Sequence, residues 1–347
     1  MADDPGFDPT SVNLDTADPT DIICYLNAGG NDYDGRLGAR ISALFVILVV
    51  STATTLFPVL ATRVKRLHVP LYVYLFARYF GSGVIIATAF IHLLDPAYDE
   101  IGPASCVGMT GGWAEYSWPA GITLTSVMTI FLFDFLADWY VERKYGKILP
   151  ENGASGALPA SSAEHGNVDG YQSDVSIDEE KTQRAFREQI AAFGILEFGV
   201  IFHSVIIGLN LGVVGEEFST LYPVLVFHQS FEGLGIGARL SSIPFPRHLR
   251  WLPWFLCIAY GLTTPIAIAI GLGLRTTYDS GSFTANVVSG VLDSISAGIL
   301  IYTGLVEMLA KDFIFDPERT KDSKRIAFML VSLYLGAIIM ALLGKWA

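Results

Sequence analysis

The stretch HSVIIGLNLGVVGEEFSTLYPVLVFHQSFEG, residues 203–233, places two of the chain's six histidines and a glutamate in very apolar surroundings. Imidazole and carboxylate groups lose their hydration there, which costs free energy unless a partner replaces the water. Two apolar arms of helical length, joined by the short turn VGEEFST, predict a helical hairpin. His203 lies on the first arm, and His228 and Glu232 lie on the second.

The composition of the whole chain indicates an integral membrane protein. Its 347 residues are 52% hydrophobic and only 16% charged, whereas soluble domains average about 25% charged residues. The polar, acidic N-terminal segment lacks the pattern of a cleavable signal peptide. We expect an all-α, polytopic fold with eight transmembrane helices, because segments long and apolar enough to cross a bilayer occur at 41–62, 71–94, 120–141, 190–214, 219–239, 252–274, 285–309 and 326–345.

The distribution of basic residues predicts the orientation in the membrane. If the N-terminus is outside, most of the 22 lysines and arginines fall in segments that face the cytosol, where positive charge normally collects. Both termini should then be extracytoplasmic. The chain divides into an acidic outer tail (1–39), helices one to three (40–142), a cytosolic loop (143–189) and helices four to eight (190–347). The loop is rich in glycine, serine and acidic residues, which predicts disorder.

The same topology places two of the three cysteines outside the membrane. Cys24 falls in the outer tail and Cys106 in the outer loop after the second span. An oxidising compartment permits a disulfide between them, and two free thiols are the alternative. Cys257 lies inside the sixth span and is expected to be a small buried apolar residue.

The hairpin geometry brings its three ionisable groups to one depth. Folding the antiparallel arms about residue 217 sets position 203 level with roughly position 231. His228 and Glu232 are four residues apart and share a helix face. Ionisable groups at membrane depth are rare and are functional hypotheses by default, and the other spans add His92, Asp134, Asp138, Glu197, Asp293 and Glu307.

Imidazole and carboxylate groups together favour borderline divalent metals, zinc or iron(II) before manganese or cobalt. Buried packing of hydrogen-bonded histidines and a membrane proton relay are the alternatives. Neutral oxygens near the three groups come from Ser204, Gln229 and Asn210, which with water would complete the ligand set.

Several of these segments resemble the signature segments of the ZIP (Zrt/Irt-like) metal transporters. The matching pieces are HSVIIGLNLG, HQSFEGLGIGARL, GVIIATAFIHLLDPA, the TTP of the sixth span, and SAGILIYTGLVEMLA. The entry to the first span is similar to fungal zinc-uptake members. The resemblance covers roughly residues 30–347, and the loop 143–189 has no counterpart.

The resemblance implies eight helices, outer termini and passage of a divalent metal into the cytosol, and it also implies dimers in which one helix bundle moves against another. By motif position, His203, His228 and Glu232 are the metal ligands. Carboxylates of some bacterial members are replaced here by Ile207, Gln229 and Thr264, so we expect one transported ion per site. The expected pathway residues are His92, Asp95, Asp134, Glu197, Asp293 and Glu307, the last on the cytosolic release side.

Two other classes of protein compete with this reading. An intramembrane zinc-dependent hydrolase or receptor would hold a fixed metal with an open water position, and a proton-coupled carrier would move an organic solute. No nucleotide-binding glycine motif is present, so we expect no ATP-driven pump, no resident cofactor and no nucleic-acid partner. The expected partners are Zn²⁺ or Fe²⁺, the lipid bilayer and a second copy of the chain. The expected location is the plasma membrane, with the vacuole as the alternative.

Overall fold

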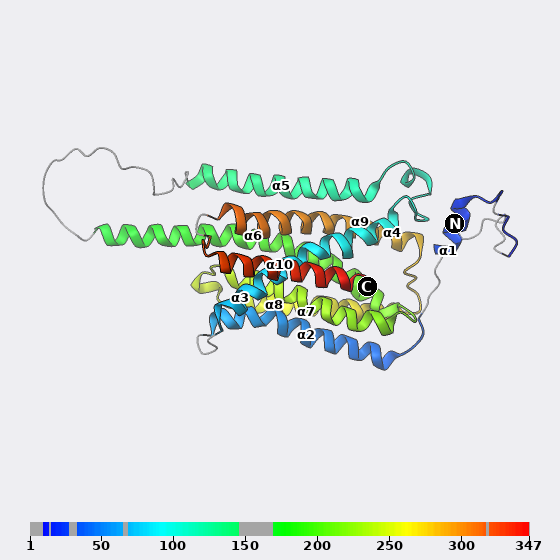
Figure 1. The fold of residues 1–347 in the computed structure, drawn as a ribbon, viewed down its shortest axis with the longest axis horizontal. Helices are drawn as coiled ribbons and strands as arrows, with labels where there is room; N and C mark the ends of the chain where they lie inside the picture. Colours follow the sequence, from blue (N-terminus) through cyan, green and yellow to red (C-terminus); the bar gives the residue numbers. More distant parts are fainter. Residues whose placement is uncertain are drawn as a thin grey trace.

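The structure is a computed structural model that describes residues 10–13, 15–27, 33–64, 69–145, 169–316 and 319–346. All regular structure within these residues is helical, and no strand occurs among them (Figure 1). The elements in chain order are α1 (Pro19–Asn27), α2 (Leu37–Arg63), α3 (Leu71–Ala87), the π-helix η2 (Thr88–Leu94), α4 (Asp95–Ile101), η3 (Gly111–Trp113), α5 (Trp118–Tyr145), α6 (Asp169–Val213), α7 (Phe218–Ser242), η4 (Arg247–Leu249), α8 (Leu252–Leu274), α9 (Phe283–Tyr302), the π-helix η5 (Thr303–Phe315) and α10 (Ser323–Leu343).

Seven helical segments of the described chain are long and apolar enough to cross a membrane. They coincide with seven of the eight predicted spans. The eighth predicted span, 219–239, is helical as α7 over 25 residues, but it is not among those seven. Helix α7 carries the polar side chains of His228, Gln229 and Glu232, which lower its mean hydropathy.

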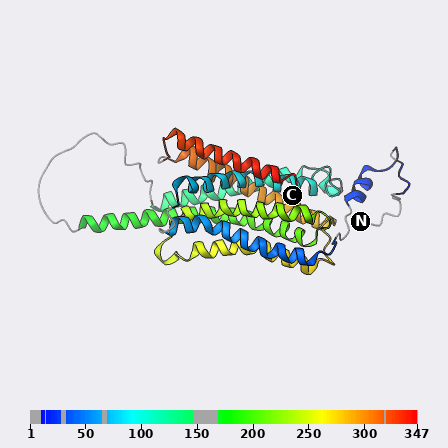
Figure 2. The ribbon, with the colours of Figure 1, turned by 60° about the horizontal axis from the view of Figure 1, so that its bottom comes forward.

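The long helices form one elongated bundle (Figures 1 and 2), and α7 lies beside α2 in it. Helix α2 packs against α7 and α8, and α6 packs against α8. On the other side of α7, α3 packs against both α7 and α10, while α5 packs mainly against α9. The largest apolar core joins residues from α2, α3, α6, α7, α8 and α9. The candidate ligands on α7 therefore lie between two groups of helices rather than at the surface.

Small residues allow α3 and α7 to approach each other closely, as is common for helices in membranes. A Cβ atom placed on Gly235 of α7 would lie 2.9 Å from the Cα of Gly81 on α3. Likewise, a Cβ on Gly237 would overlap the carbonyl oxygen of Thr55 on α2. The two helices that flank α7 therefore touch its backbone directly.

Replacing Gly235 by valine should separate α3 from α7 and destabilise the protein. Overpacking a tight contact usually costs about 1–3 kcal/mol, and here the obstacle is backbone, which cannot turn aside. We expect a lower melting temperature and less monodisperse protein in detergent. Gly194→Val is the matched control, because a Cβ at that helical glycine meets nothing within 4 Å. Equal losses for both variants would contradict the proposed contact.

The helix that contains the predicted fourth span begins inside the predicted cytosolic loop. Helix α6 begins at Asp169 and runs for 45 residues, so residues 169–189 are helical rather than disordered. The segment that precedes residue 190 contains Glu, Lys, Gln, Arg and Ala, which have high helix propensity. The segment is too polar to show the apolar pattern from which the spans were predicted. The rest of the predicted loop, 146–168, lies outside the described residues.

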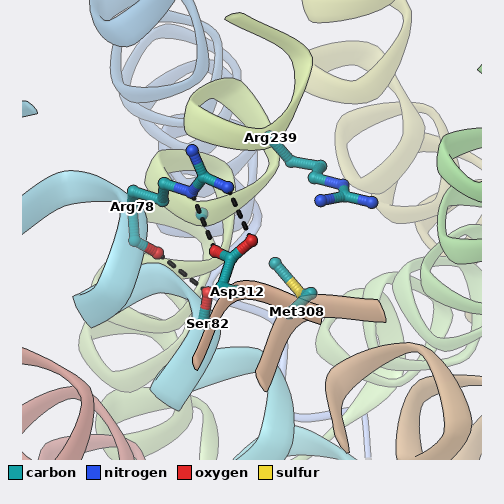
Figure 3. A pocket seen from close by; sticks show the side chains of 6 residues that line it. Arg78, Ser82, Arg239, Met308 and Asp312 are labelled. Atoms are coloured by element: carbon teal, nitrogen blue, oxygen red, sulfur yellow. Dashed lines mark hydrogen bonds and ion pairs between the residues drawn. The ribbon is translucent and has the colours of Figure 1, made fainter. Parts of the chain in front are cut away.

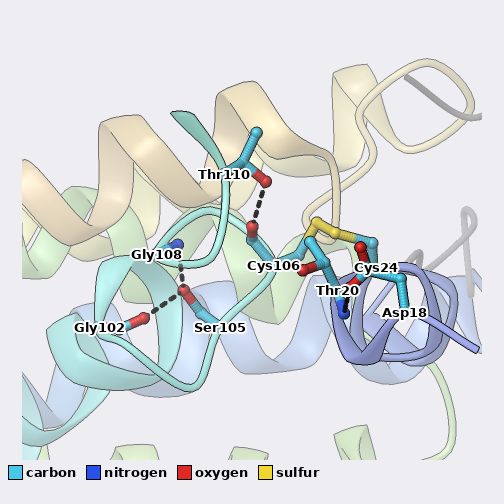
Figure 4. Close-up of a disulfide and its surroundings, with 8 residues drawn as sticks. All are labelled: Asp18, Thr20, Cys24, Gly102, Ser105, Cys106, Gly108 and Thr110. Carbon is cyan, nitrogen blue, oxygen red and sulfur yellow. Dashed lines mark hydrogen bonds between the residues drawn. A yellow bond between two sulfur atoms is a disulfide. The ribbon is translucent and has the colours of Figure 1, made fainter. Parts of the chain in front are cut away.

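A disulfide joins Cys24 of α1 to Cys106 in the segment that follows α4 (Figure 4). This segment has its own hydrogen bonds: the Ser105 hydroxyl donates to the Gly102 carbonyl and accepts from the Gly108 amide. The structure thus adopts the disulfide alternative of the sequence analysis and ties α1 to the end of the bundle opposite the extended part of α6 (Figure 2).

Candidate metal site

The α6–α7 hairpin brings His203 and His228 into contact. Only residues 214–217 separate the two helices, so the arms run antiparallel. The Nε2 atoms of His203 and His228 lie 3.3 Å apart. Both side chains are buried, with 3% and 0% of their surface exposed. The register predicted from the sequence therefore agrees with the observed pairing of these imidazoles.

Glu232 lies one turn after His228 and is also fully buried. Its Oε2 atom is 3.7 Å from the His228 Nε2 atom. The Tyr260 hydroxyl of α8 lies within hydrogen-bonding distance of two acceptors, Gln229 Oε1 at 3.1 Å and Glu232 Oε2 at 3.2 Å. Tyr260 thus holds the two α7 side chains on the α8 side of the site.

His92 adds a third imidazole from another direction. It belongs to the π-helix η2, and its ring stands edge-on to that of His228 with 4.9 Å between the ring centroids. Its Nε2 atom is 3.1 Å from the Met340 carbonyl oxygen of α10. Short π-helical segments are often found at functional sites. Here the segment places a pathway residue predicted from the sequence directly beside the histidine pair.

Several buried polar atoms around the histidines have no hydrogen-bond partner in the described part of the chain. Buried polar groups are nearly always paired, so a cluster of exceptions indicates a place for water or an ion. The unpartnered atoms of this cluster are Ser204 Oγ, His228 Nδ1, Gln229 Nε2, Glu232 Oε1 and Thr264 Oγ1.

The spacing of the histidine nitrogens suits a shared metal ion. Two nitrogens bound at about 2.0–2.1 Å to a tetrahedral zinc lie roughly 3.3 Å apart, which matches the separation between His203 and His228. The carboxylate of Glu232 is a few tenths of an ångström farther away. Among the described residues, no group of three or more His, Cys, Asp or Glu side chains is arranged to hold a metal ion as it stands. Two ligands are thus in position and a third is close.

The other predicted residues lie at varied distances from this centre. Asn210 is seven residues beyond His203 on α6, about 10 Å along the helix. Asp95 is exposed at the start of α4. Asp134 of α5 accepts a 2.7 Å hydrogen bond from the Tyr302 hydroxyl. Glu197 is partly buried on α6, and Asp293 is buried on α9. The side chain of Asp138 lies outside the described part of the structure.

Glu307 belongs to a second charged cluster on η5. Its carboxylate lies 3.4 Å from the Arg239 guanidinium of α7 and also forms an ion pair with Lys311. Beside it, Arg78 of α3 makes two bonds to Asp312, of 3.0 and 2.8 Å (Figure 3). Arg78 and Arg239 face a small pocket from two different helices (Figure 3). Arg239 follows Glu232 by seven residues on α7, so the site helix is bound to η5 by this ion pair.

Sequence reasoning did not identify Tyr260, Arg239 or Asp312 as parts of these clusters. Tyr260 lies in an apolar span where an aromatic residue carries no special signal. Arg239 and Asp312 occur near predicted helix ends, where charged residues are usual. Only their positions in the packed structure distinguish them from solvated side chains.

The bundle and its buried imidazoles define a polytopic helical membrane protein with a polar site between its helices. A family profile described as ZIP zinc transporter matches residues 37–344. The chain therefore belongs to the ZIP zinc transporter family, as the resemblance in its sequence indicated. It is a transporter and not an enzyme, which removes the intramembrane hydrolase from consideration.

Individual relatives agree over nearly the full length. The chain is 57% identical to Zinc-regulated transporter 1 of Saccharomyces cerevisiae, over 98% of this chain and 97% of that protein. It is 39% identical to Zinc-regulated transporter 1 of Schizosaccharomyces pombe, over 97% and 92% respectively. It is 32% identical to Zinc transporter 9 of Oryza sativa subsp. japonica, over 94% of each chain.

Proposed function

We propose that this protein carries zinc across the membrane into the cytosol through a site made by His203, His228 and Glu232. The observation that carries this proposal is the 3.3 Å separation of two fully enclosed histidine nitrogens. Burying these nitrogens and the nearby unpartnered polar atoms costs desolvation free energy, which apolar packing does not offset. A cation bound between the two nitrogens would offset that cost.

The site holds a single ion in this proposal. The carboxylates that some bacterial family members use to bridge a second metal are replaced here by Ile207, Gln229 and Thr264. Glu232 would close on the ion from 3.7 Å, and Ser204, Gln229, Asn210 or water would complete the ligand set. A site that is incomplete without its cargo binds more weakly than a preformed cage, and transport requires binding weak enough for release.

The proposed pathway runs from the outer acidic residues to the cluster on η5. Asp95, Asp293 and His92 would lead the ion inward to the histidine pair, with Asp134 and Glu197 as further polar groups of the pathway. Glu307 would receive the ion on the cytosolic side. Its ion pairs with Arg239 and Lys311 would compete with the ion there and so favour release.

The proposed topology has eight spans, with α7 as the fifth and both termini outside. The ends of the described chain lie toward the same end of the bundle (Figure 1), as this topology requires, and the Cys24–Cys106 disulfide suits an oxidising outer compartment. The proposed location is the plasma membrane, in keeping with the fungal zinc-uptake members that the sequence resembles. A homodimer is part of the proposal because other helices of the chain cover little of α5. Only 6% of its apolar stretch within Trp118–Ala137 is buried.

Zinc-65 uptake into proteoliposomes that contain the purified chain tests the proposed function. Saturable uptake that unlabelled zinc suppresses, and that empty vesicles lack, is the expected result. Iron(II) in equal excess should compete poorly, because the relatives reported above are named for zinc. Measuring zinc-65 uptake in the same vesicles under an imposed pH gradient shows whether a proton gradient drives zinc transport. Uptake equal to that of empty vesicles would refute the proposal.

A further inference from the structure

Two carboxylates outside the histidine site lie close together where α4 packs on α9. Glu100 is in the last turn of α4, and Asp293 is in the middle of α9. A Cβ atom placed on Gly290 would lie 3.2 Å from the Cβ of Glu100. The Cβ atom of Glu100 therefore lies directly over Gly290, one helical turn before Asp293 on α9.

Asp293 is buried and Glu100 is partly buried, and each has a buried carboxylate oxygen without a hydrogen-bond partner in the described part of the chain. Only 3% of the surface of Asp293 is exposed, and its Oδ1 atom has no hydrogen-bond partner in the described part of the chain. The Oε2 atom of Glu100 is also buried and without such a partner. Neither residue forms an ion pair within the described residues. Two neighbouring carboxylates with buried oxygens repel each other, and either a bound cation or a proton on one of them relieves that repulsion.

Other oxygen groups complete the surroundings of this pair. Ser289, which is 8% exposed, precedes Gly290 on α9 and adds a hydroxyl next to the glycine that the Glu100 Cβ atom covers. Tyr278, in the loop before α9, has a pKa that is raised, first by burial and then by the negative charge of Glu100. The set contains oxygen atoms only, without imidazole or thiolate. Such ligands suit a cation that keeps part of its water shell.

The pair also lies on a route toward the histidines. Ser296 follows Asp293 by three residues on α9, is fully buried, and has an Oγ atom without a hydrogen-bond partner among the described residues. Helix α9 packs against η2, which holds His92 beside His228. Buried polar atoms thus continue from Glu100 through Asp293 and Ser296 toward the central site.

We infer that Glu100 and Asp293 form an outer binding site for a partly hydrated divalent cation, occupied before the ion reaches His203 and His228. This inference rests on the proposed function, because the ion held there is the ion that is transported. The two negative charges match one divalent ion, and retained water explains how two carboxylates and a hydroxyl suffice. The ion would lose its remaining water molecules when it binds the imidazoles of His203 and His228.

Zinc-65 binding to the full chain in detergent, measured by equilibrium dialysis, tests this site apart from the central one. The background variant carries His228→Ala and Glu232→Gln and should still retain a single zinc ion. Adding Asp293→Asn should remove that ion, whereas adding Glu115→Gln, an exposed carboxylate of the outer loop, should not. Loss of all binding in the background variant, or retention after Asp293→Asn, would overturn the inference. If Asp293→Asn lowers the melting temperature, Glu100→Gln replaces it.

Uptake by the single variants gives a second readout. With the central site intact, Asp293→Asn should raise the KM for zinc uptake roughly tenfold and leave the maximal rate nearly unchanged, the pattern of a lost initial binding interaction. If the two carboxylates share a proton instead of binding a cation, KM will not move and the inference fails. A failure of this kind leaves uptake through the histidine site intact, so it is distinguishable from failure of the proposed function.

Discussion

Replacing His228 by alanine should abolish zinc uptake while leaving the protein folded. His228 is the central member of the site: its Nε2 atom is 3.3 Å from His203 and 3.7 Å from Glu232, and its ring contacts His92. Losing a partner outside the ligand shell typically costs 10- to 100-fold in metal affinity, so losing a ligand should reduce uptake by at least about 100-fold. Zinc-65 uptake in cells that lack their own zinc transporters measures this loss.

The chain supplies a matched control for this variant. His248 is an exposed histidine in η4, and His248→Ala removes the same chemical group far from the hairpin. Its uptake should equal that of the wild type at equal surface expression. Glu232→Gln is the companion variant, since it keeps a hydrogen-bond acceptor for Tyr260 but removes the charge. Substantial uptake by both His228→Ala and Glu232→Gln would show that the ion crosses elsewhere.

The core of the candidate site could be predicted from the sequence because it depends on local regularities. Two helical arms and a short turn fix the register of His203 against His228, and the four-residue spacing fixes Glu232. The relative positions of these three residues therefore follow from the sequence of one hairpin, without knowledge of how distant helices pack. The position of His92 needed the family resemblance, because its contact with His228 depends on packing between η2 and α7, which are distant in the sequence.

Contacts between distant helices account for what the sequence did not predict. Tyr260 becomes a partner of Glu232 only because α8 packs against the hairpin. Asp312 pairs with Arg78 across 234 positions of sequence, and no periodicity in either helix records that pairing. The early start of α6 was missed for another reason. A charged helix outside the membrane has no apolar pattern, so the search for apolar spans does not detect it.

Arg40 illustrates the same limit and offers the largest expected effect on stability. In the sequence it is one basic residue at the entrance to the first span, yet its side chain is completely buried. Its guanidinium donates to the carbonyl oxygens of Gly35, Leu211 and Val214, and to the Asp34 carboxylate. It also lies over the rings of Tyr33 and Phe218, 4.8 and 4.6 Å from their centroids. One side chain thus joins the start of α2 to the end of α6.

Replacing Arg40 by methionine should lower the melting temperature of the detergent-purified protein by roughly 5 °C. Removing one partner of a buried ion pair typically costs about 3–5 kcal/mol, and in a chain of 347 residues each 1 kcal/mol shifts the melting temperature by about 1–2 °C. Arg36→Gln is the control: Arg36 also pairs with Asp34, at 2.7 Å, but its side chain is 41% exposed, and exposed pairs contribute only about 0–1 kcal/mol. Equal shifts for the two variants would mean that the connection between α2 and α6 does not depend on Arg40. A large shift confined to Arg40→Met would establish that the α6–α7 turn of the site hairpin is held in place by this buried arginine.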